Sequence, residues 1–108
     1  METDFNQYTM RPEMNTLIRL LARKNIPFDV VAHQACGKIV FNIAIPNADS
    51  PVIDVASSDT TYGGSSGLLE AMAFEEASEA TNYDAIGWLN AYKAMIVIKR
   101  ALDLAKHK

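Results

Sequence analysis

The chain has 108 residues, a net charge of −3, 49% hydrophobic residues and 21% charged residues. This length suits one domain with one core, and this composition excludes an intrinsically disordered chain. The longest uninterrupted apolar run, residues 94–98, is far shorter than the ~20 residues that a membrane-spanning helix needs, so the sequence predicts no membrane span.

The first predicted element is a helix near the start of the chain. Residues 1–10 show no apolar period, and we expect a flexible tail followed by a single domain at residues 11–108. Four apolar residues then recur at steps of three and four, which predicts an amphipathic helix over residues 11–24. They are Met14, Leu17, Ile18 and Leu21. Asn25 is a residue type that ends helices in the left-handed conformation.

Three strand-like runs follow the helix, at residues 27–33, 38–45 and 51–57. The second is the clearest, because apolar side chains occupy alternate positions along it. These side chains are Ile39, Phe41, Ile43 and Ile45. Short connections between the runs favour antiparallel neighbours, so we predict a three-stranded antiparallel meander.

The second half of the chain is predicted to be helical. Residues 57–67 are rich in Ser, Thr, Asp and Gly and indicate a loop. A short helix is expected at residues 68–74, and Thr81 with Asp84 indicates the start of a long helix that ends near Lys106 and spans ~35 Å. The predicted fold class is therefore α+β: an N-terminal helix, a three-stranded antiparallel meander, a short helix and a long C-terminal helix.

The long helix carries four consecutive apolar residues that point in all directions around its axis. These are Met95, Ile96, Val97 and Ile98. One intramolecular face cannot cover all four, so a homodimer through this helix is one hypothesis. The alternative is that the first helix and the sheet enclose the long helix. Trp88 and Tyr92, four residues apart, are expected to belong to the core.

A glycine- and serine-rich segment, Tyr-Gly-Gly-Ser-Ser-Gly at residues 62–67, invites several catalytic interpretations. Leu68 stands where a Walker A loop needs Lys, and a dinucleotide fingerprint lacks its first glycine. The Gly-x-Ser-x-Gly pattern is formally present, but no strand ends directly before it and the only downstream histidine is His107. Anion binding at the following helix start stays open, although Asp59 and Glu70 oppose it. We therefore expect these glycines to shape the backbone.

Titratable residues elsewhere give few further sites. Asp54 interrupts an apolar strand, so it points either outward into solvent or inward, where it must accept hydrogen bonds. His33 and Cys36 offer two metal ligands where a closed zinc site needs four, and we expect neither a metal nor a cofactor. A single cysteine, with no basic segment and apolar run at the start of the chain, favours a cytoplasmic setting.

Charges are distributed unevenly along the chain. Residues 49–92 carry eight acids and no Lys or Arg, and residues 93–108 carry five bases against one acid. This pattern indicates that the two segments are neighbours in the fold, or that an acidic surface engages a basic partner. The C-terminal bases are too few for a nucleic-acid interface, so the sequence argues against nucleic-acid binding. They include Lys99, Arg100, Lys106 and Lys108.

Residues 53–72 read Ile-Asp-Val-Ala-Ser-Ser-Asp-Thr-Thr-Tyr-Gly-Gly-Ser-Ser-Gly-Leu-Leu-Glu-Ala-Met. This segment resembles one found in small phage and prophage proteins of Gram-positive bacteria, a family without an assigned activity. The matching positions are Asp54, Val55, Tyr62, Gly63, Gly67, Leu68, Leu69, Glu70 and Met72. Where that family often has Cys-His, this chain has Ser57 and Ser58, so no thiol or metal role carries over. The resemblance implies a genomic setting and no mechanism.

These observations favour a phage or prophage accessory or regulatory protein that acts by binding a protein partner, and not an enzyme. A rigid loop after the third strand would form the recognition surface. The candidate binding residues are Asp54, Asp59, Tyr62, Gly63, Gly64, Ser65 and Ser66. The alternative is a small enzyme or ligand-binding domain that uses the Gly-Ser loop at residues 59–67. Its candidate residues are His33, Asp54, Tyr62 and Ser65.

Overall fold

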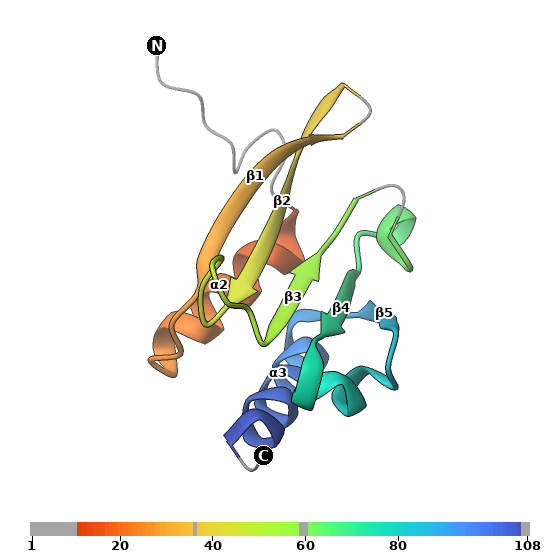
Figure 1. Cartoon of the computed structure of the whole chain (residues 1–108). Helices are drawn as coiled ribbons and strands as arrows, with labels where there is room; N and C mark the ends of the chain where they lie inside the picture. Colours follow the sequence, from red (N-terminus) through yellow and green to blue (C-terminus); the bar gives the residue numbers. More distant parts are fainter. Residues whose placement is uncertain (1–10, 36, 59–60, 107–108) are drawn as a thin grey trace.

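The computed structural model describes residues 11–35, 37–58 and 61–106 (Figure 1). The predicted tail at residues 1–10 lies outside them, as do Cys36, Asp59 and His107. In chain order the described elements are α2 (Pro12–Arg23), β1 (Asp29–Ala35), β2 (Lys38–Ile45), β3 (Ile53–Ala56), the 3₁₀ helix η1 (Gly64–Ser66), β4 (Leu69–Ala73), the 3₁₀ helix η2 (Glu75–Thr81), β5 (Ala85–Leu89) and α3 (Ala91–Lys106).

The five strands form one antiparallel sheet whose spatial order is the chain order, β1 to β5. The predicted α+β class and the N-terminal helix are confirmed, and β2 has the predicted bounds. The predicted number of strands is wrong, because β4 and β5 continue the meander. The ladder between β1 and β2 covers seven residue pairs, whereas the ladder between β2 and β3 covers only four.

One face of the sheet carries the hydrophobic core. Side chains alternate across a strand, so every second residue of the central strands points to the same face. On this face, Ile43 of β2, Val55 of β3 and Leu69 of β4 are fully buried. They form a single cluster with buried side chains of α2 and α3, and Figure 1 shows both helices behind the sheet. We call the opposite face, which neither helix covers, the open face.

Helix α2 forms where its apolar period predicts. Pro12 occupies the first turn, where its missing N–H costs no hydrogen bond, and Glu13 and Arg23 complement the helix dipole at the two ends. The helix buries Met14, Leu17 and Leu21. Asn25 follows the helix with φ of 57°, as expected for a left-handed stop.

The short helix predicted at residues 68–74 is wrong, because this segment is strand β4. Leu69, Ala71 and Ala73 are buried, whereas Glu70 and Met72 point to the open face. This is the two-residue period of a strand. Gly67 adopts φ of 76° at the end of η1, so it ends a helical turn there and does not begin one.

The long helix predicted from Thr81 is also wrong in its first part. Thr81 is fully buried, and its hydroxyl accepts a hydrogen bond from the Ala73 N–H at 3.1 Å. Asn82 and Tyr83 have φ of 56° and 65°, which is incompatible with a continuous helix, and β5 follows them. Helix α3 begins at Ala91 and its 16 residues span about 24 Å.

Helix α3 has its own N-terminal cap. The Asn90 side-chain oxygen accepts a hydrogen bond from the Lys93 N–H at 2.8 Å. Glu13 of α2 accepts a second one, from the Ala91 N–H at 2.7 Å, and so connects the starts of the two helices. At the other end, Arg100 forms an exposed ion pair with Glu79 of η2 at 2.9 Å. The basic C-terminal segment therefore does contact the acidic middle segment.

Candidate functional site

The connection between β3 and β4 is tied together by its own polar side chains. The Ser57 hydroxyl donates to the Leu68 carbonyl oxygen at 2.8 Å, which closes the base of the connection. The Thr61 hydroxyl accepts from the Ser58 N–H and donates to the Ser58 carbonyl oxygen, both at 3.0 Å. Arg11 reaches the connection from the start of α2, where Nη1 donates to the Gly64 carbonyl oxygen. The connection is thus held to the body of the fold.

Two predicted site residues, Gly63 and Gly64, are required by the packing of this connection. A Cβ atom on Gly64 would lie 1.7 Å from the Ser58 carbonyl oxygen. Gly63 has φ of 81°, and a Cβ atom there would lie 2.8 Å from the Trp88 backbone. Both glycines allow the chain to approach another backbone closely, which explains why glycine occupies these positions.

The same close approach brings Tyr62 next to strand β5. The Tyr62 N–H donates to Glu70 Oε2 at 2.9 Å, and the Tyr62 carbonyl oxygen accepts from the Trp88 N–H at 3.2 Å. Gly87 permits this contact, because a Cβ atom there would lie 2.0 Å from the Tyr62 Cβ. The backbones of Tyr62 and Trp88 are therefore fixed against one another.

The side chains of Tyr62 and Trp88 nevertheless face solvent. They are 58% and 61% exposed, and we call them the aromatic pair. The prediction that Trp88 and Tyr92 belong to the core is wrong, since Tyr92 is 65% exposed. Trp88 also has φ of 62°, a left-handed conformation that costs a bulky residue on the order of 1–3 kcal/mol. The fold thus holds a large aromatic side chain outward at some cost in stability.

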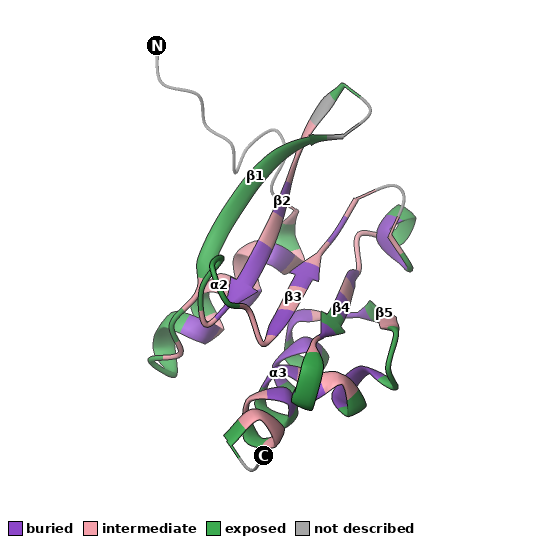
Figure 2. Ribbon diagram, viewed as in Figure 1, coloured by how far each residue is buried: buried purple, intermediate pink, exposed green. Residues whose placement is uncertain are grey.

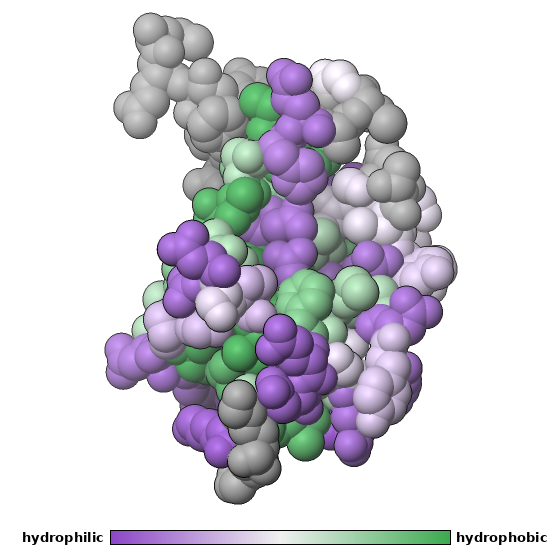
Figure 3. Space-filling view, in the orientation of Figure 1, coloured by the Kyte–Doolittle hydropathy of each residue, from purple (hydrophilic) through white to green (hydrophobic). Residues whose placement is uncertain are grey.

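The Asp54 side chain points to the open face of the sheet and away from the helices, because its neighbours Ile53 and Val55 on β3 point to the core. It is half-buried there, and the Asn42 side-chain amide donates to its Oδ2 at 2.6 Å. Burial raises the pKa of the Asp54 carboxyl above 3.8, while the Asn42 hydrogen bond and the charge of His33 act in the opposite direction. His33, Asn42 and Asp54 therefore form a polar group across β1, β2 and β3. Figure 3 shows hydrophilic residues on this side of the molecule between hydrophobic patches.

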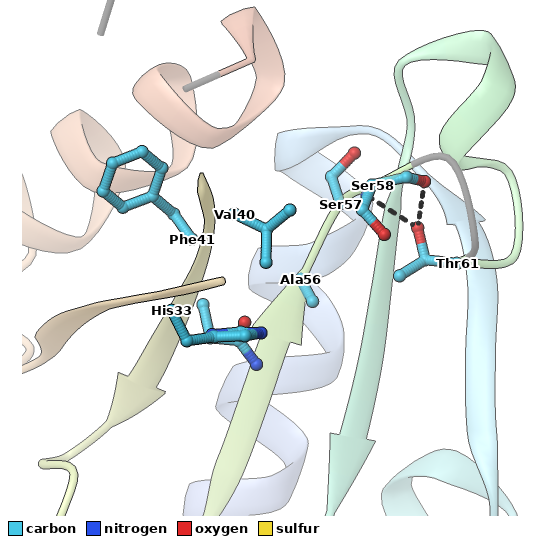
Figure 4. Close-up of a pocket in the computed structure, with 8 residues that line it drawn as sticks. His33, Val40, Phe41, Ala56, Ser57, Ser58 and Thr61 are labelled. Atoms are coloured by element: carbon cyan, nitrogen blue, oxygen red, sulfur yellow. Dashed lines mark hydrogen bonds between the residues drawn. The ribbon is translucent and has the colours of Figure 1, made fainter. Parts of the chain in front are cut away.

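A hollow of about 210 Å³ lies beside this polar group. It forms because β2 pairs with β3 only from Asn42 onward, so the chain that follows β3 diverges from β2. In Figure 4, Ser57, Ser58 and Thr61 lie on one side of the hollow, Val40 lies in the middle and His33 lies on the other side. The hollow is open to solvent on the outside.

The predicted site residues do not form one site. The structure brings His33 and Asp54 close enough to interact, but Tyr62 and Ser65 do not line the hollow beside them. Ser65 and Ser66 are exposed on η1, and Asp59 lies outside the described residues. Sequence reasoning missed Asn42 and Trp88. The position of Asn42 depends on the strand register, and that of Trp88 depends on strand β5, which was not predicted.

Two further properties hold for the described part of the chain. No three His, Cys, Asp or Glu residues among those described are grouped so that they could hold a metal ion. None of the described helices is both long and apolar enough to cross a membrane. Comparison of the chain with protein-family models, curated proteins and solved structures finds no match.

Proposed function

We propose that the protein is a non-enzymatic accessory or regulatory protein that binds a protein partner through the aromatic pair, Tyr62 and Trp88. The observation that carries this proposal is that two large aromatic side chains, 58% and 61% exposed, stand on backbones that are joined by the hydrogen bond from the Trp88 N–H to the Tyr62 carbonyl oxygen and by close glycine contacts. A phage or prophage origin is part of the proposal and rests on the resemblance of residues 53–72 alone.

Exposed aromatic side chains are effective anchors for a protein partner. Trp and Tyr are enriched among the few interface residues that supply most of the binding energy. Covering each ring would contribute roughly 1.5–3 kcal/mol through burial of apolar surface. The fixed backbone reduces the ordering entropy that binding normally costs. The left-handed conformation of Trp88 fits this role, because strain of this kind is concentrated at functional positions.

A second candidate function, binding of a small polar molecule, is favoured by the hollow beside His33. Its lining includes the polar residues Ser58, Thr61 and Asn42, of which the Thr61 hydroxyl and the Asn42 amide already form hydrogen bonds within the chain. However, about 210 Å³ is below the roughly 300–1,000 Å³ of typical ligand sites, and the hollow is open to solvent. We therefore rank this function second.

A capture experiment with matched variants tests the proposed function. Immobilised wild-type protein is incubated with lysate of its host cell, in parallel with Trp88→Ala and with the control Tyr83→Ala, whose side chain is 76% exposed outside the aromatic pair. We expect a stoichiometric partner to be retained by wild type and by Tyr83→Ala, and to be lost with Trp88→Ala. Circular dichroism confirms that each variant is folded.

The affinity of the purified partner for each variant then measures how much each aromatic side chain contributes to binding. Trp88 is the only tryptophan, so its fluorescence reports directly on its own burial as the partner is titrated. We expect a blue shift on binding, and a loss of affinity of about 30-fold or more for Tyr62→Ala, which corresponds to roughly 2 kcal/mol. Equal retention of the partner by Trp88→Ala and wild type would contradict the proposal.

A further inference from the structure

Strand β1 is an outer strand of the sheet, and no other strand of the described part of the chain lies beside its outer side. It pairs with β2 without interruption from Asp29 to Ala35, and no described residue pairs with its other side. Residues 29–34 are all exposed, and Figure 2 shows this part of β1 as exposed. Such a strand presents a row of backbone N–H and C=O groups that can pair with another strand.

Among the described residues, most of the usual protections of an edge strand are absent from β1, and Asp29 is the one carboxylate on it. Monomeric proteins discourage edge pairing with proline, lysine, bulges or a covering segment. The sequence of β1, Asp-Val-Val-Ala-His-Gln-Ala, contains neither proline nor lysine, and its register with β2 shows no bulge. The other edge, β5, differs. Its pairing with β4 shifts register between Leu69 and Ala71, and Trp88 interrupts it with a left-handed φ.

We propose that β1 pairs antiparallel with β1 of a second copy of this chain, around a two-fold axis at Val31. This proposal goes beyond the proposed function and is independent of it, because it uses the opposite edge of the sheet from Trp88. The interface would be isologous, as in most homodimers of soluble proteins. The two sheets would join into one sheet of ten strands.

Complementarity between the hydrogen-bonding groups of Asp29 and His33 selects this register among the available ones. Residues directly opposite one another in an antiparallel pair must lie on the same face of the sheet, so the two-fold axis passes through a residue and not between two residues. For most of β1 to be paired, this residue must lie near the middle of the strand. An axis at Val31 places Asp29 of each copy opposite His33 of the other copy. An axis at Val30 would place Asp29 opposite Val31, and an axis at Ala32 would place Val31 opposite His33.

The contacts in the selected register are chemically matched. An imidazole N–H of His33 can donate to the Asp29 carboxylate whether or not the ring is charged. Asp29 is already positioned, because its Oδ2 accepts the Ala48 N–H at 2.7 Å, which leaves Oδ1 for the second copy. Between these two pairs, Val31 meets Val31. Asp29 also disfavours pairing with an unrelated strand that has no donor opposite it, so the same residue supplies specificity.

Most of the four consecutive apolar residues of α3 are covered within the single chain, in contrast to the expectation from the sequence. Met95 is 7% exposed and Ile98 is fully buried within the chain, so both pack against the sheet and the other helix. Ile96, at 69% exposure, is the member of this group that faces solvent. A dimer through α3 would therefore depend on Ile96, which provides a matched control for the β1 interface.

Light scattering during size exclusion tests the proposal over a series of protein concentrations. Because one strand pair makes a small interface, we expect wild type to shift reversibly from 11.9 kDa to twice that mass in the micromolar range. Val31→Lys, which places two positive charges together at the axis, should stay at 11.9 kDa throughout, and Ile96→Lys should dimerise like wild type. Val31 is 36% exposed in the single chain, so its substitution should leave the monomer folded.

The opposite results overturn the proposal. A wild-type chain that stays monomeric into the millimolar range, a Val31→Lys variant that dimerises normally, or an Ile96→Lys variant that alone becomes monomeric would each exclude the β1 dimer.

The register of the β1 pair is determined by cysteine scanning in a Cys36→Ser background, using Val30→Cys, Val31→Cys and Ala32→Cys with oxidised glutathione. Val31→Cys should cross-link fastest, since directly opposite Cα atoms lie about 4.5–5.5 Å apart. Faster cross-linking at Val30→Cys or Ala32→Cys would exclude the Asp29 to His33 pairing.

Discussion

Gly64 lies where a larger residue cannot fit without moving the backbone. A Cβ atom there would lie 1.7 Å from the Ser58 carbonyl oxygen and 2.5 Å from the Thr61 hydroxyl. We expect Gly64→Ala to lower the free energy of unfolding by roughly 3 kcal/mol, as overpacking does. The control is Gly67→Ala, where φ is 76° but nothing lies within 4 Å of the added atom, so only about 1–2 kcal/mol should be lost. Urea unfolding followed by tryptophan fluorescence measures both, and equal losses would contradict this account.

Asp54 is expected to make the folded state less stable at neutral pH than a neutral isostere would. Burial raises the pKa of Asp54 in the folded state above 3.8, its ordinary value, so the folded chain binds this proton more tightly than the unfolded chain does. Stability is therefore lost as pH rises from 3.8 through the folded-state pKa, and the loss is complete above it.

Asp54→Asn removes this charge and can still accept the hydrogen bond from Asn42. We expect the variant to be more stable than wild type near neutral pH, and the difference to vanish below pH 3.8. Urea unfolding near neutral pH and at a pH below 3.8 measures this difference in stability. The control is Asp49→Asn, because Asp49 is exposed. A variant that is less stable than wild type at neutral pH would show that the Asn42 contact favours the charged form more than burial disfavours it.

At the scale of elements, the first half of the chain could be predicted from its sequence and much of the second half could not. The apolar period of α2 and the alternation in β2 are long enough to identify their structure. Strand β4 is short, and its Leu-Glu-Ala-Met-Ala sequence contains strong helix formers, so helix propensity outweighed an alternation of only five residues. Contact with β3 decides the conformation, and that contact cannot be seen locally.

The candidate site shows the same limit. Strand alternation correctly allows Asp54 to point away from the core, but its partner Asn42 follows only from the register of β2 with β3. The backbone role of Gly63 and Gly64 agrees with the sequence interpretation of the loop. The exposure of Trp88 could not be predicted, because it depends on β5 approaching the connection between β3 and β4.

Asn90, and not Thr81, begins the last helix. Its side-chain oxygen accepts the Lys93 N–H at 2.8 Å, which satisfies one of the amide groups that a helix start leaves unpaired. We expect Asn90→Ala to lower the free energy of unfolding by about 1 kcal/mol, and Asn90→Asp to retain most of the stability. Thermal and urea unfolding measure the difference. Equal stability of Asn90→Ala and wild type would show that Glu13, which accepts the Ala91 N–H, is a sufficient cap on its own.

At the scale of the whole molecule, the sheet separates two proposed surfaces. The aromatic pair lies beside β5 at one edge, and β1 forms the other edge. A two-fold dimer through β1 would therefore leave both aromatic pairs uncovered, and each dimer would carry two partner sites. Binding to a partner that is itself dimeric or repeated would then gain effective concentration from the second site.

The irregularity of β5 also limits how far chains could join edge to edge. Polymeric growth of a sheet needs a regular edge at each end, so that every added chain exposes a new template. Here β1 is the regular edge, because its pairing with β2 is uninterrupted. The other edge strand, β5, is irregular, because its pairing with β4 shifts register and Trp88 has a left-handed φ. Pairing of β1 with β1 occupies the regular edge of both copies at the same time. Strand addition is therefore self-terminating, and this architecture favours a closed assembly over fibres.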